Sequence, residues 1–333
     1  RNQRICQQNT MFQVYADVLS AASHAPNRLP RSVLEDVADD FAARHVQLKS
    51  KFSRCCIKRQ RRRKCKSRKL RLGLKLGEGY SGDVYSAVEM KNGGTVALKF
   101  VSNLPAFIAE KRALEAVDHP NVIKLRASDD IPEGIPKRLK QRLLVLDYCS
   151  NGDLFSVLKQ GRLPESIARA YSSQLFKAIA ACHRAQRFHR DIKPENILMA
   201  NDWSLRLADF GFASGTLVVK DAQSCGTPTY MAPEFFQSSI ASDLSSADVW
   251  SAGVVTFFLV YGVPPVERAT SACWLYKKIQ AGEWKDFWRA HDKGVSFSVS
   301  QASKEFLQKL LQPAASQRPS ADTVLSDPWF DHP

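Results

Sequence analysis

The sequence has no uninterrupted apolar run of about 18 residues, which is the length that a helix needs to cross a membrane. Its first residues also lack the basic region, apolar core and cleavage site of a secretory signal. We therefore expect no transmembrane segment and an intracellular location, in the cytoplasm or the nucleus. Hydrophobic residues make up 44% and charged residues 24% of the chain, proportions that are typical of a globular protein.

The cysteine spacing of a disulfide-stabilised secreted protein is missing as well. The eight cysteines are scattered along the chain, so we expect reduced thiols rather than disulfides. Cys55, Cys56 and Cys65 lie close together, but no second Cys/His pair at zinc-finger spacing accompanies them, and we expect no zinc site there. No EF-hand loop for calcium is present either.

The net charge of +15 is concentrated in the N-terminal part of the chain. Residues 1–71 contain 18 Lys and Arg against 5 Asp and Glu, whereas residues 72–333 contain 30 against 28. The densest stretch, residues 49–71, has 13 basic residues in 23 positions. Blocks of like charge repel themselves, so we predict that 49–71 is a disordered basic linker.

Three roles for residues 49–71 remain open. The segment is a solvated linker, a patch for an anionic partner such as a nucleic acid or an import receptor, or an anchor on a lipid surface. In the last case Cys55 and Cys56 would carry palmitoyl groups, because a single acyl chain needs a second signal for stable membrane association.

Residues 1–48 are predicted to form a short helical N-terminal extension. Ser32 followed by Glu35 is a capping-box pattern. After it, Val33, Val37 and Phe41 recur every four residues and form one apolar stripe. We favour a helix packed on the rest of the protein, and a helix that binds a partner is the alternative.

From Leu72 the pattern changes to short strands, and from Leu154 helical periodicity dominates. Strands followed by helices indicate an α+β protein with two lobes. We predict one domain over residues 72–330. Its small N-lobe, residues 72–147, would contain an antiparallel sheet and one helix, and its larger C-lobe, residues 152–330, would be mainly α-helical.

Five motifs follow in a fixed order. A glycine-rich loop, Gly77-Glu78-Gly79-Tyr80-Ser81-Gly82-Asp83-Val84, would let the backbone approach phosphate groups, because glycine has no Cβ. Lys99 lies 22 residues after Gly77 in an apolar strand. Three further motifs are His189-Arg190-Asp191-Ile192-Lys193-Pro194-Glu195-Asn196, Asp209-Phe210-Gly211 and Ala232-Pro233-Glu234.

Together these motifs resemble the signature of eukaryotic Ser/Thr protein kinases, with the bilobal fold of that family. Trp288 and Asp327-Pro328-Trp329-Phe330 make the C-terminal part most similar to the calcium/calmodulin-dependent kinase group. The resemblance implies ATP and Mg²⁺ as cofactors and protein substrates with Ser or Thr acceptors. We further expect a monomer.

The resemblance also assigns catalytic and metal-binding roles. Asp191 is expected to orient the substrate hydroxyl as catalytic base, with Lys193 near the γ-phosphate and Thr227 beside it. Asn196 and Asp209 are expected to bind Mg²⁺, for which amide and carboxylate oxygens are suitable ligands. Lys193 is typical of Ser/Thr kinases rather than tyrosine kinases.

The remaining expected positions bind the nucleotide. Lys99 would contact the α- and β-phosphates, held by an ion pair with Glu110. The other positions lie on the glycine-rich loop, the flanking strands and the hinge, and they are Leu76, Gly77, Glu78, Gly79, Tyr80, Ser81, Gly82, Val84, Ala97, Asp147, Cys149, Asp153 and Leu198.

Several structural residues match the family pattern too. Asp248 is expected to brace the catalytic loop, and Arg318 is expected to form a buried ion pair with Glu234. The residues expected to stack into a regulatory spine are Leu114, Leu125, His189 and Phe210.

Two functional questions follow from the motifs. The first is whether the chain is an active kinase or a pseudokinase scaffold; because Lys99, Asp191 and Asp209 are all present, we predict an active enzyme. The second is how the activation loop is switched. Arg190 suits a loop phosphate, but Gln223 stands at the usual phosphorylation site, so we expect Ser224 or Thr216 to replace it, or a loop that is ordered without phosphate.

Overall fold

Residues 70–79, 82–89, 92–129, 142–219, 226–237, 242–293 and 295–331 are described by the structure, a computed structural model. The helix expected within residues 1–48 lies outside the described residues. So do residues 49–69, the larger part of the expected basic linker 49–71. Tyr80, Ser81, Gln223 and Ser224 are also outside them. All described residues belong to one compact unit.

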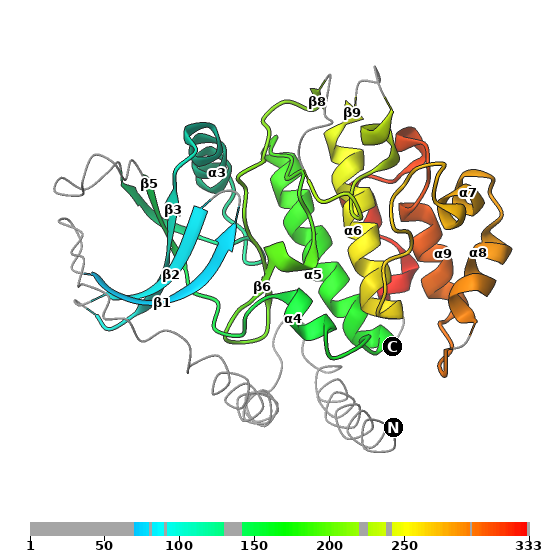
Figure 1. Ribbon diagram of the computed structural model, residues 1–333, viewed down its shortest axis with the longest axis horizontal. Helices are drawn as coiled ribbons and strands as arrows, with labels where there is room; N and C mark the ends of the chain where they lie inside the picture. Colours follow the sequence, from blue (N-terminus) through cyan, green and yellow to red (C-terminus); the bar gives the residue numbers. More distant parts are fainter. Residues whose placement is uncertain are drawn as a thin grey trace. The chain divides into compact units, whose positions relative to one another are not determined.

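The first lobe is built on a five-stranded antiparallel sheet (Figure 1). Its strands are β1 (Leu70–Gly79), β2 (Gly82–Glu89), β3 (Thr95–Val101), β4 (Leu125–Asp129) and β5 (Arg142–Asp147), in the order β1-β2-β3-β5-β4. The first strand thus begins two residues before the expected boundary at residue 72. The sheet and its helix match the fold expected for the small lobe.

Alternation along the strands gives the sheet two different faces. One face carries a hydrophobic cluster that includes Ala87, Val96 and Leu98, all less than a tenth exposed. The opposite face of β3 carries Ala97, Lys99 and Val101, because successive side chains in a strand point to opposite sides. Lys99 is therefore placed on a different face from the hydrophobic cluster.

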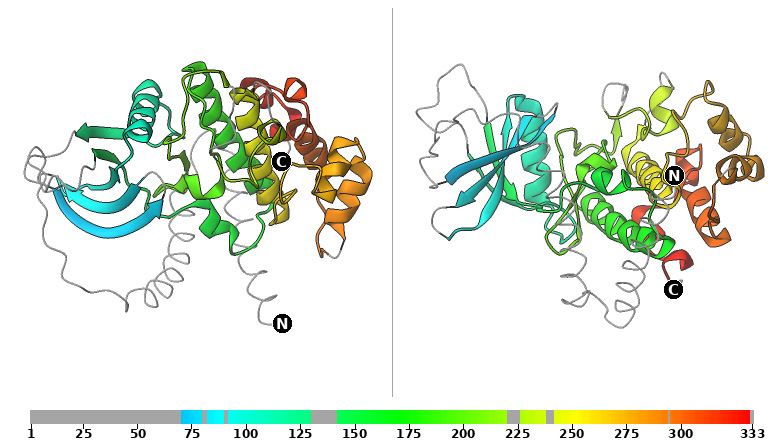
Figure 2. Two further views of the ribbon diagram at one scale, coloured as in Figure 1. Left: turned by 45° about the horizontal axis from the view of Figure 1, so that its top comes forward. Right: turned by 60° about the horizontal axis from the view of Figure 1, so that its bottom comes forward.

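Helix α3 (Leu104–Ala116) packs against this sheet (Figures 1 and 2). Its start is fixed by the Asn103 side chain, which accepts a hydrogen bond from the Ala106 backbone N–H at 3.0 Å, and by a proline in the first turn. Phe107, Glu110 and Leu114 recur at helical spacing and are buried. The same periodicity that buries α3 therefore also turns Glu110 inward.

The second lobe is mainly helical, as expected. Its α-helices are α4 (Leu154–Leu158), α5 (Glu165–Arg184), α6 (Leu244–Tyr261), α7 (Trp274–Gln280), α8 (Trp284–Asp292), α9 (Gln301–Leu310) and α10 (Ala321–Val324). Short 3₁₀ turns are η1 (Pro194–Asn196), η3 (Pro233–Phe236), η4 (Ala315–Gln317) and η5 (Pro328–Asp331). Two small hairpins pair β6 (Ile197–Met199) with β7 (Leu205–Leu207) and β8 (Val218–Val219) with β9 (Ser242–Asp243).

Helix α6 is the core of this lobe. The Asp243 side chain caps its first turn by accepting from the Ser245 and Ser246 backbone N–H groups, and Gly262 ends it with φ +76°. By length and composition α6 could cross a membrane, and it is the single helix in the described ranges with that property. However, 83% of it is buried inside the protein, as in the core helix of a globular domain. Asp248 interrupts the apolar run, which is why the sequence shows no continuous stretch.

A buried ion pair joins the C-terminal segment to η3, as expected from the sequence. Arg318 is 6% exposed and Glu234 7% exposed. The guanidinium donates to both carboxylate oxygens at 2.8 Å, and to the backbone oxygens of Ser246, Gln312 and Pro313. These five bonds use all five N–H donors of arginine, so no buried donor is left unpaired.

We expect Arg318→Ala to lower the free energy of unfolding by about 3–5 kcal/mol, because it leaves the buried Glu234 carboxylate without its cation. As the matched control, Arg184→Ala removes an ion pair with Asp322 in which both side chains are more than half exposed, and it should cost less than about 1 kcal/mol. Denaturant titration followed by tryptophan fluorescence measures both, and equal losses would contradict the assignment.

Candidate active site

An ammonium group and two carboxylates meet beneath the sheet. Lys99 is 4% exposed and Glu110 is fully buried. Lys99 Nζ donates to Glu110 Oε1 and Oε2, at 2.8 and 2.7 Å, and to Asp209 Oδ1 at 2.8 Å. A buried ammonium needs such partners because it has lost its hydration, and three acceptor oxygens match its three N–H donors. The expected Lys99–Glu110 pair is thus present, with Asp209 as a third member.

Opposite charges in this group stabilise each other, whereas burial and the nearby Asp209 charge leave the pKa of Glu110 raised. Burial lowers the pKa of Lys99, but the adjacent Glu110 and Asp209 carboxylates outweigh burial and leave the pKa raised. Burial raises the pKa of Asp209, yet the Lys99 ammonium outweighs it, so that pKa is lowered. Lys99 is therefore cationic and Asp209 anionic at neutral pH.

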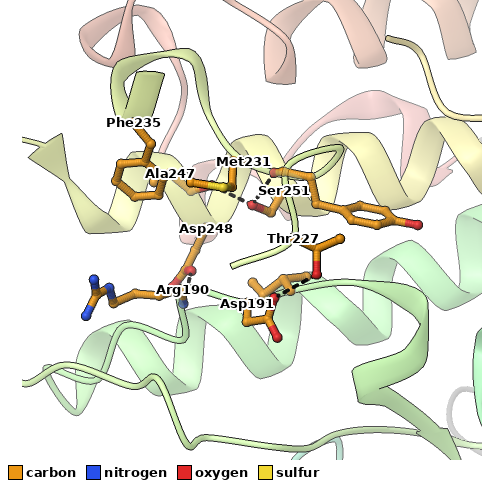
Figure 3. Close-up of a pocket in the computed structure, with 10 residues that line it drawn as sticks. Arg190, Asp191, Thr227, Met231, Phe235, Ala247, Asp248 and Ser251 are labelled. Carbon is orange, nitrogen blue, oxygen red and sulfur yellow. Dashed lines mark hydrogen bonds between the residues drawn. The ribbon is translucent and has the colours of Figure 1, made fainter. Parts of the chain in front are cut away.

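A second cluster surrounds Asp191, which is 6% exposed. Lys193 Nζ lies 2.7 Å from Asp191 Oδ2, and Asn196 Nδ2 donates to the same oxygen at 2.9 Å. Thr227 Oγ1 donates to Asp191 Oδ1 at 3.3 Å (Figure 3). It also accepts from Lys193 Nζ at 2.9 Å. The three residues expected to be catalytic, Asp191, Lys193 and Thr227, therefore share one hydrogen-bond network.

The backbone that carries Asp191 is held by Asp248 of α6, as expected. Asp248 is 1% exposed and accepts from the His189 and Arg190 backbone N–H groups, both at 2.8 Å. His183 Nε2 of α5 lies 3.0 Å from Asp248 Oδ2. Arg190 has φ +70°, a left-handed conformation that is uncommon for a residue with a side chain. The two backbone bonds to Asp248 hold that conformation in place.

His189 connects the catalytic loop to the segment with Asp209. The Asp191 backbone N–H donates to His189 Nδ1 at 3.3 Å, so Nε2 carries the ring hydrogen and donates to the Ala208 oxygen at 3.0 Å. The His189 and Phe210 rings lie 4.6 Å apart, as expected for neighbours in the spine. Asp209 itself has φ +61° and accepts from the Gly211 backbone N–H at 3.3 Å.

The residues expected around the nucleotide come from both lobes. Gly77, Glu78 and Gly79 end β1 and pair with Val84, Asp83 and Gly82 of β2. Ala97, 8% exposed, lies on the same face of β3 as Lys99, and Leu198 lies in β6. Leu76 is 46% exposed, which fits a residue that faces an open nucleotide site. Gly82 has φ +144°, and a Cβ there would lie 2.0 Å from the Phe100 oxygen, so the loop requires glycine at this position.

Two expected nucleotide ligands also have structural partners. Asp153, expected at the ribose, caps α4 by accepting from the Ser156 backbone N–H at 2.6 Å. Asp147, at the start of the hinge, pairs with Arg126 of β4. Sequence reasoning missed both contacts. A short polar residue just before a helix is a cap signal for Asp153, whereas nothing in the sequence links Arg126 to Asp147.

The residues expected to bind Mg²⁺ fit that ion chemically. Asn196 Nδ2 donates to the Asp191 carboxylate and backbone oxygen, which leaves its amide oxygen as the atom for a cation. The Ala208 backbone N–H donates to the backbone oxygen of Asn196 at 2.9 Å and ties this loop to the residue before Asp209. No group of three or more His, Cys, Asp or Glu side chains at metal-binding distance occurs among the described residues.

A pocket opens beside Asp191 (Figure 3). It lies between the catalytic loop, the segment from Thr227 to Phe235 and helix α6. Ser251 of α6 donates to the Tyr230 oxygen at 2.7 Å and fixes one wall. The residues that line it are Arg190, Asp191, Ile192, Thr227, Tyr230, Met231, Phe235, Ala247, Asp248 and Ser251.

Comparison with known proteins agrees with this geometry. The family model that matches describes a protein kinase domain, and it covers residues 70–330. This chain belongs to the protein kinase family. The fold and the family predicted from the motifs are therefore confirmed, and the kinase uses ATP.

Curated relatives of the kinase include fungal and plant proteins. Over 78% of its length it is 33% identical to cytokinesis protein sepH of Aspergillus niger and 32% identical to cell division control protein 7 of Schizosaccharomyces pombe. Over 79% of its length it is 33% identical to CBL-interacting serine/threonine-protein kinase 26 of Arabidopsis thaliana. The alignments span 19%, 23% and 58% of those proteins, respectively. Such relatives agree with the prediction of a Ser/Thr kinase domain, and nothing supports the pseudokinase alternative.

The pH dependence of alkylation at Cys149, the expected hinge residue, tests whether its thiol is buried. Burial raises the pKa of its thiol to about 11, from an ordinary value of 9.0. A raised pKa lowers the thiolate fraction at pH 8 by about a hundredfold, but a more basic thiolate is also more nucleophilic, so we expect alkylation at pH 8 to be about tenfold slower than for a small free thiol. The rate should rise steadily as the pH approaches 11. Peptide-resolved mass spectrometry after timed iodoacetamide treatment measures it; labelling at the rate of the free thiol would refute this environment.

Proposed function

We propose that this kinase transfers the γ-phosphate of ATP, with Mg²⁺, to Ser or Thr hydroxyls of protein substrates. One observation carries the proposal: Lys99, paired with Glu110, reaches Asp209, while Asp191 lies in a separate network with Lys193 and Asn196. Phosphoryl transfer depends on positioning and on charge over the transferring oxygens, and these two clusters supply both.

The Lys99 cluster would orient the nucleotide. A cationic ammonium attracts the α- and β-phosphates, and Glu110 keeps it from turning away. Asp209 and the Asn196 amide oxygen would hold Mg²⁺, which supplies positive charge beside the phosphates when bound. The direct Lys99–Asp209 contact keeps both of these charges paired.

The Asp191 cluster would receive the acceptor hydroxyl. Asp191 is a carboxylate next to a pocket, and its two oxygens are oriented by Thr227 and Asn196. It would accept the hydroxyl proton, or a hydrogen bond from it, as the oxygen attacks phosphorus. Lys193, 2.7 Å from Asp191, would stabilise the added negative charge on the transferring group.

We expect Asp191→Asn to reduce phosphate transfer by about 10²–10⁴-fold, because an amide cannot accept the proton. Nucleotide binding should be retained, since Asp191 does not belong to the Lys99 cluster. Transfer of radiolabelled γ-phosphate to a generic protein acceptor and fluorescence-detected nucleotide binding measure the two effects. The matched control is Asp286→Asn on α8, an exposed carboxylate paired with Arg289, which should leave both unchanged. Equal transfer by the wild type and Asp191→Asn would exclude the proposed chemistry.

Arg190, which lines the pocket, supports the proposal that phosphorylation of the activation loop controls the activity of the kinase. Arg190 Nε is buried without a hydrogen-bond partner in the described part of the chain. A phosphate on the activation loop would supply acceptors for it. Because Gln223 has no hydroxyl, Thr216 or Ser224 would carry that phosphate.

Phosphatase treatment should therefore lower the activity of the purified kinase by about tenfold, since the new charge-assisted bonds are lost. Before treatment, the Thr216→Ala, Ser224→Ala double variant should have the activity of the phosphatase-treated wild type, and treatment should not lower it further. Peptide phosphorylation rates before and after treatment measure this. Unchanged wild-type activity would mean that the loop needs no phosphate.

Other expectations remain proposals. We retain an anionic partner for residues 49–71, a monomeric state, and a cytoplasmic or nuclear location with membrane-surface association as an option. The charge block that motivates the partner is in the sequence. Binding of the full chain to heparin or anionic vesicles, lost on deleting 49–69, would test the partner.

A further inference from the structure

Strand β1 is irregular just before the glycine-rich loop. Leu72 pairs with Ala87, the register then shifts, and Lys75 pairs with Tyr85. Two residues of β1, Gly73 and Leu74, therefore face the single residue Ser86 of β2. This two-against-one arrangement is a β-bulge, which bends a strand and increases its local twist. A second shift follows between Lys75 and Gly77.

The Ser86 side chain fills this bulge. Its Oγ accepts from the Leu74 backbone N–H at 2.9 Å and donates to the Leu74 oxygen at 3.3 Å. One hydroxyl can do both because it has a donor and two lone pairs. A bulge interrupts the ladder and leaves backbone groups without ladder partners. The Ser86 hydroxyl takes the place of those partners for the Leu74 N–H and oxygen.

Gly73 makes room for this hydroxyl. A Cβ at residue 73 would lie 2.5 Å from Ser86 Oγ and 3.1 Å from the Ser86 backbone oxygen. The first distance is too short for any real contact, so the glycine and the serine hydroxyl fit together as a pair. Gly73 is not one of the glycines of the glycine-rich loop, and this contact explains why residue 73 is a glycine.

The bulge stands close to the nucleotide site. Leu76 and Gly77, the first residues expected to cover the nucleotide, follow Leu74 by two and three residues. Ser86 lies on the same face of β2 as Val84, and its partner on β3 is Ala97, both expected at the adenine. Moreover, β1 lies at the edge of the sheet, and β2 is the one strand in the described part of the chain that pairs with it.

We propose that Ser86 is a positioning residue that sets the bend of β1 and thereby places Leu76 and Gly77 over the nucleotide. It acts through β1 and does not contact the phosphates. The inference rests on the proposed kinase function, in which Leu76 and Gly77 belong to the ATP site. Without the hydroxyl the bulge loses its anchor, and the loop samples positions that bind nucleotide less well.

The test compares Ser86→Ala with Ser128→Ala, a control in β4 of the same sheet at a regularly paired position. We expect Ser86→Ala to raise KM for ATP and the directly measured Kd for nucleotide by about three- to tenfold, the loss expected from one or two hydrogen bonds. The kcat and the KM for a peptide acceptor should stay within about twofold, because the Asp191 cluster is untouched. Ser86→Thr, which keeps the hydroxyl, should restore the wild-type values.

Gly73→Ala supplies a second, independent arm. It should raise the same Kd on its own, because the new Cβ displaces the hydroxyl. In the Ser86→Ala background it should add less, so the two effects are non-additive.

The outcomes separate a positioning role from others. An unchanged nucleotide Kd in Ser86→Ala, or fully additive effects with Gly73→Ala, would overturn the proposal. A fall in melting temperature and kcat together with a rise in both KM values, not restored by Ser86→Thr, would also overturn it and indicate a merely structural residue. Nucleotide binding is measured without turnover, so absent phosphate transfer by the wild type would reject the kinase function while this test still stands.

Discussion

The burial of the Lys99 ammonium is the constraint on which the active site depends. A buried charge is tolerated only when it is paired, and here the partners come from α3 and from the segment with Asp209. The position of α3, the conformation at Asp209 and the course of β3 are therefore coupled. A shift of α3 that withdraws Glu110 would leave Lys99 with Asp209 alone. The Lys99 ion cluster is therefore complete only when β3, α3 and the segment with Asp209 are all in place.

Helix α6 plays the corresponding role in the helical lobe. Asp248 fixes the catalytic loop, Ser251 holds the Tyr230 backbone, and the Ser246 oxygen accepts from Arg318. Catalytic loop, substrate-side pocket and C-terminal segment are all positioned from one helix. Since α6 is almost entirely buried, Asp248 and Ser251 find their hydrogen-bond partners inside the protein, and those bonds fix the site, whereas Trp250 Nε1 of the same helix has no such partner among the described residues.

Much of the site follows from sequence, because its chemistry needs particular residue types at short, fixed spacings. Lys99, Asp191 and Asp209 belong to such motifs, and family resemblance supplied the long-range pairs Lys99–Glu110 and Glu234–Arg318. Contacts outside motifs could not be foreseen. The Arg126–Asp147 pair depends on the register of β4 against β5, and His183 meets Asp248 only through the packing of α5 on α6. The Ser86 bulge depends on a register shift that alternation does not encode.

The different anchoring of the two halves of the site has a consequence for nucleotide exchange. Strand β1, which is expected to cover the nucleotide, is an edge strand in the described part of the sheet, with Leu74 76% exposed, whereas the loop that carries Asp191 is bonded to a helix in the centre of its lobe. Opening of an edge costs far less free energy than opening of a core helix. In the proposed function, β1 can therefore open to release ADP many times while the loop that carries Asp191 keeps its geometry.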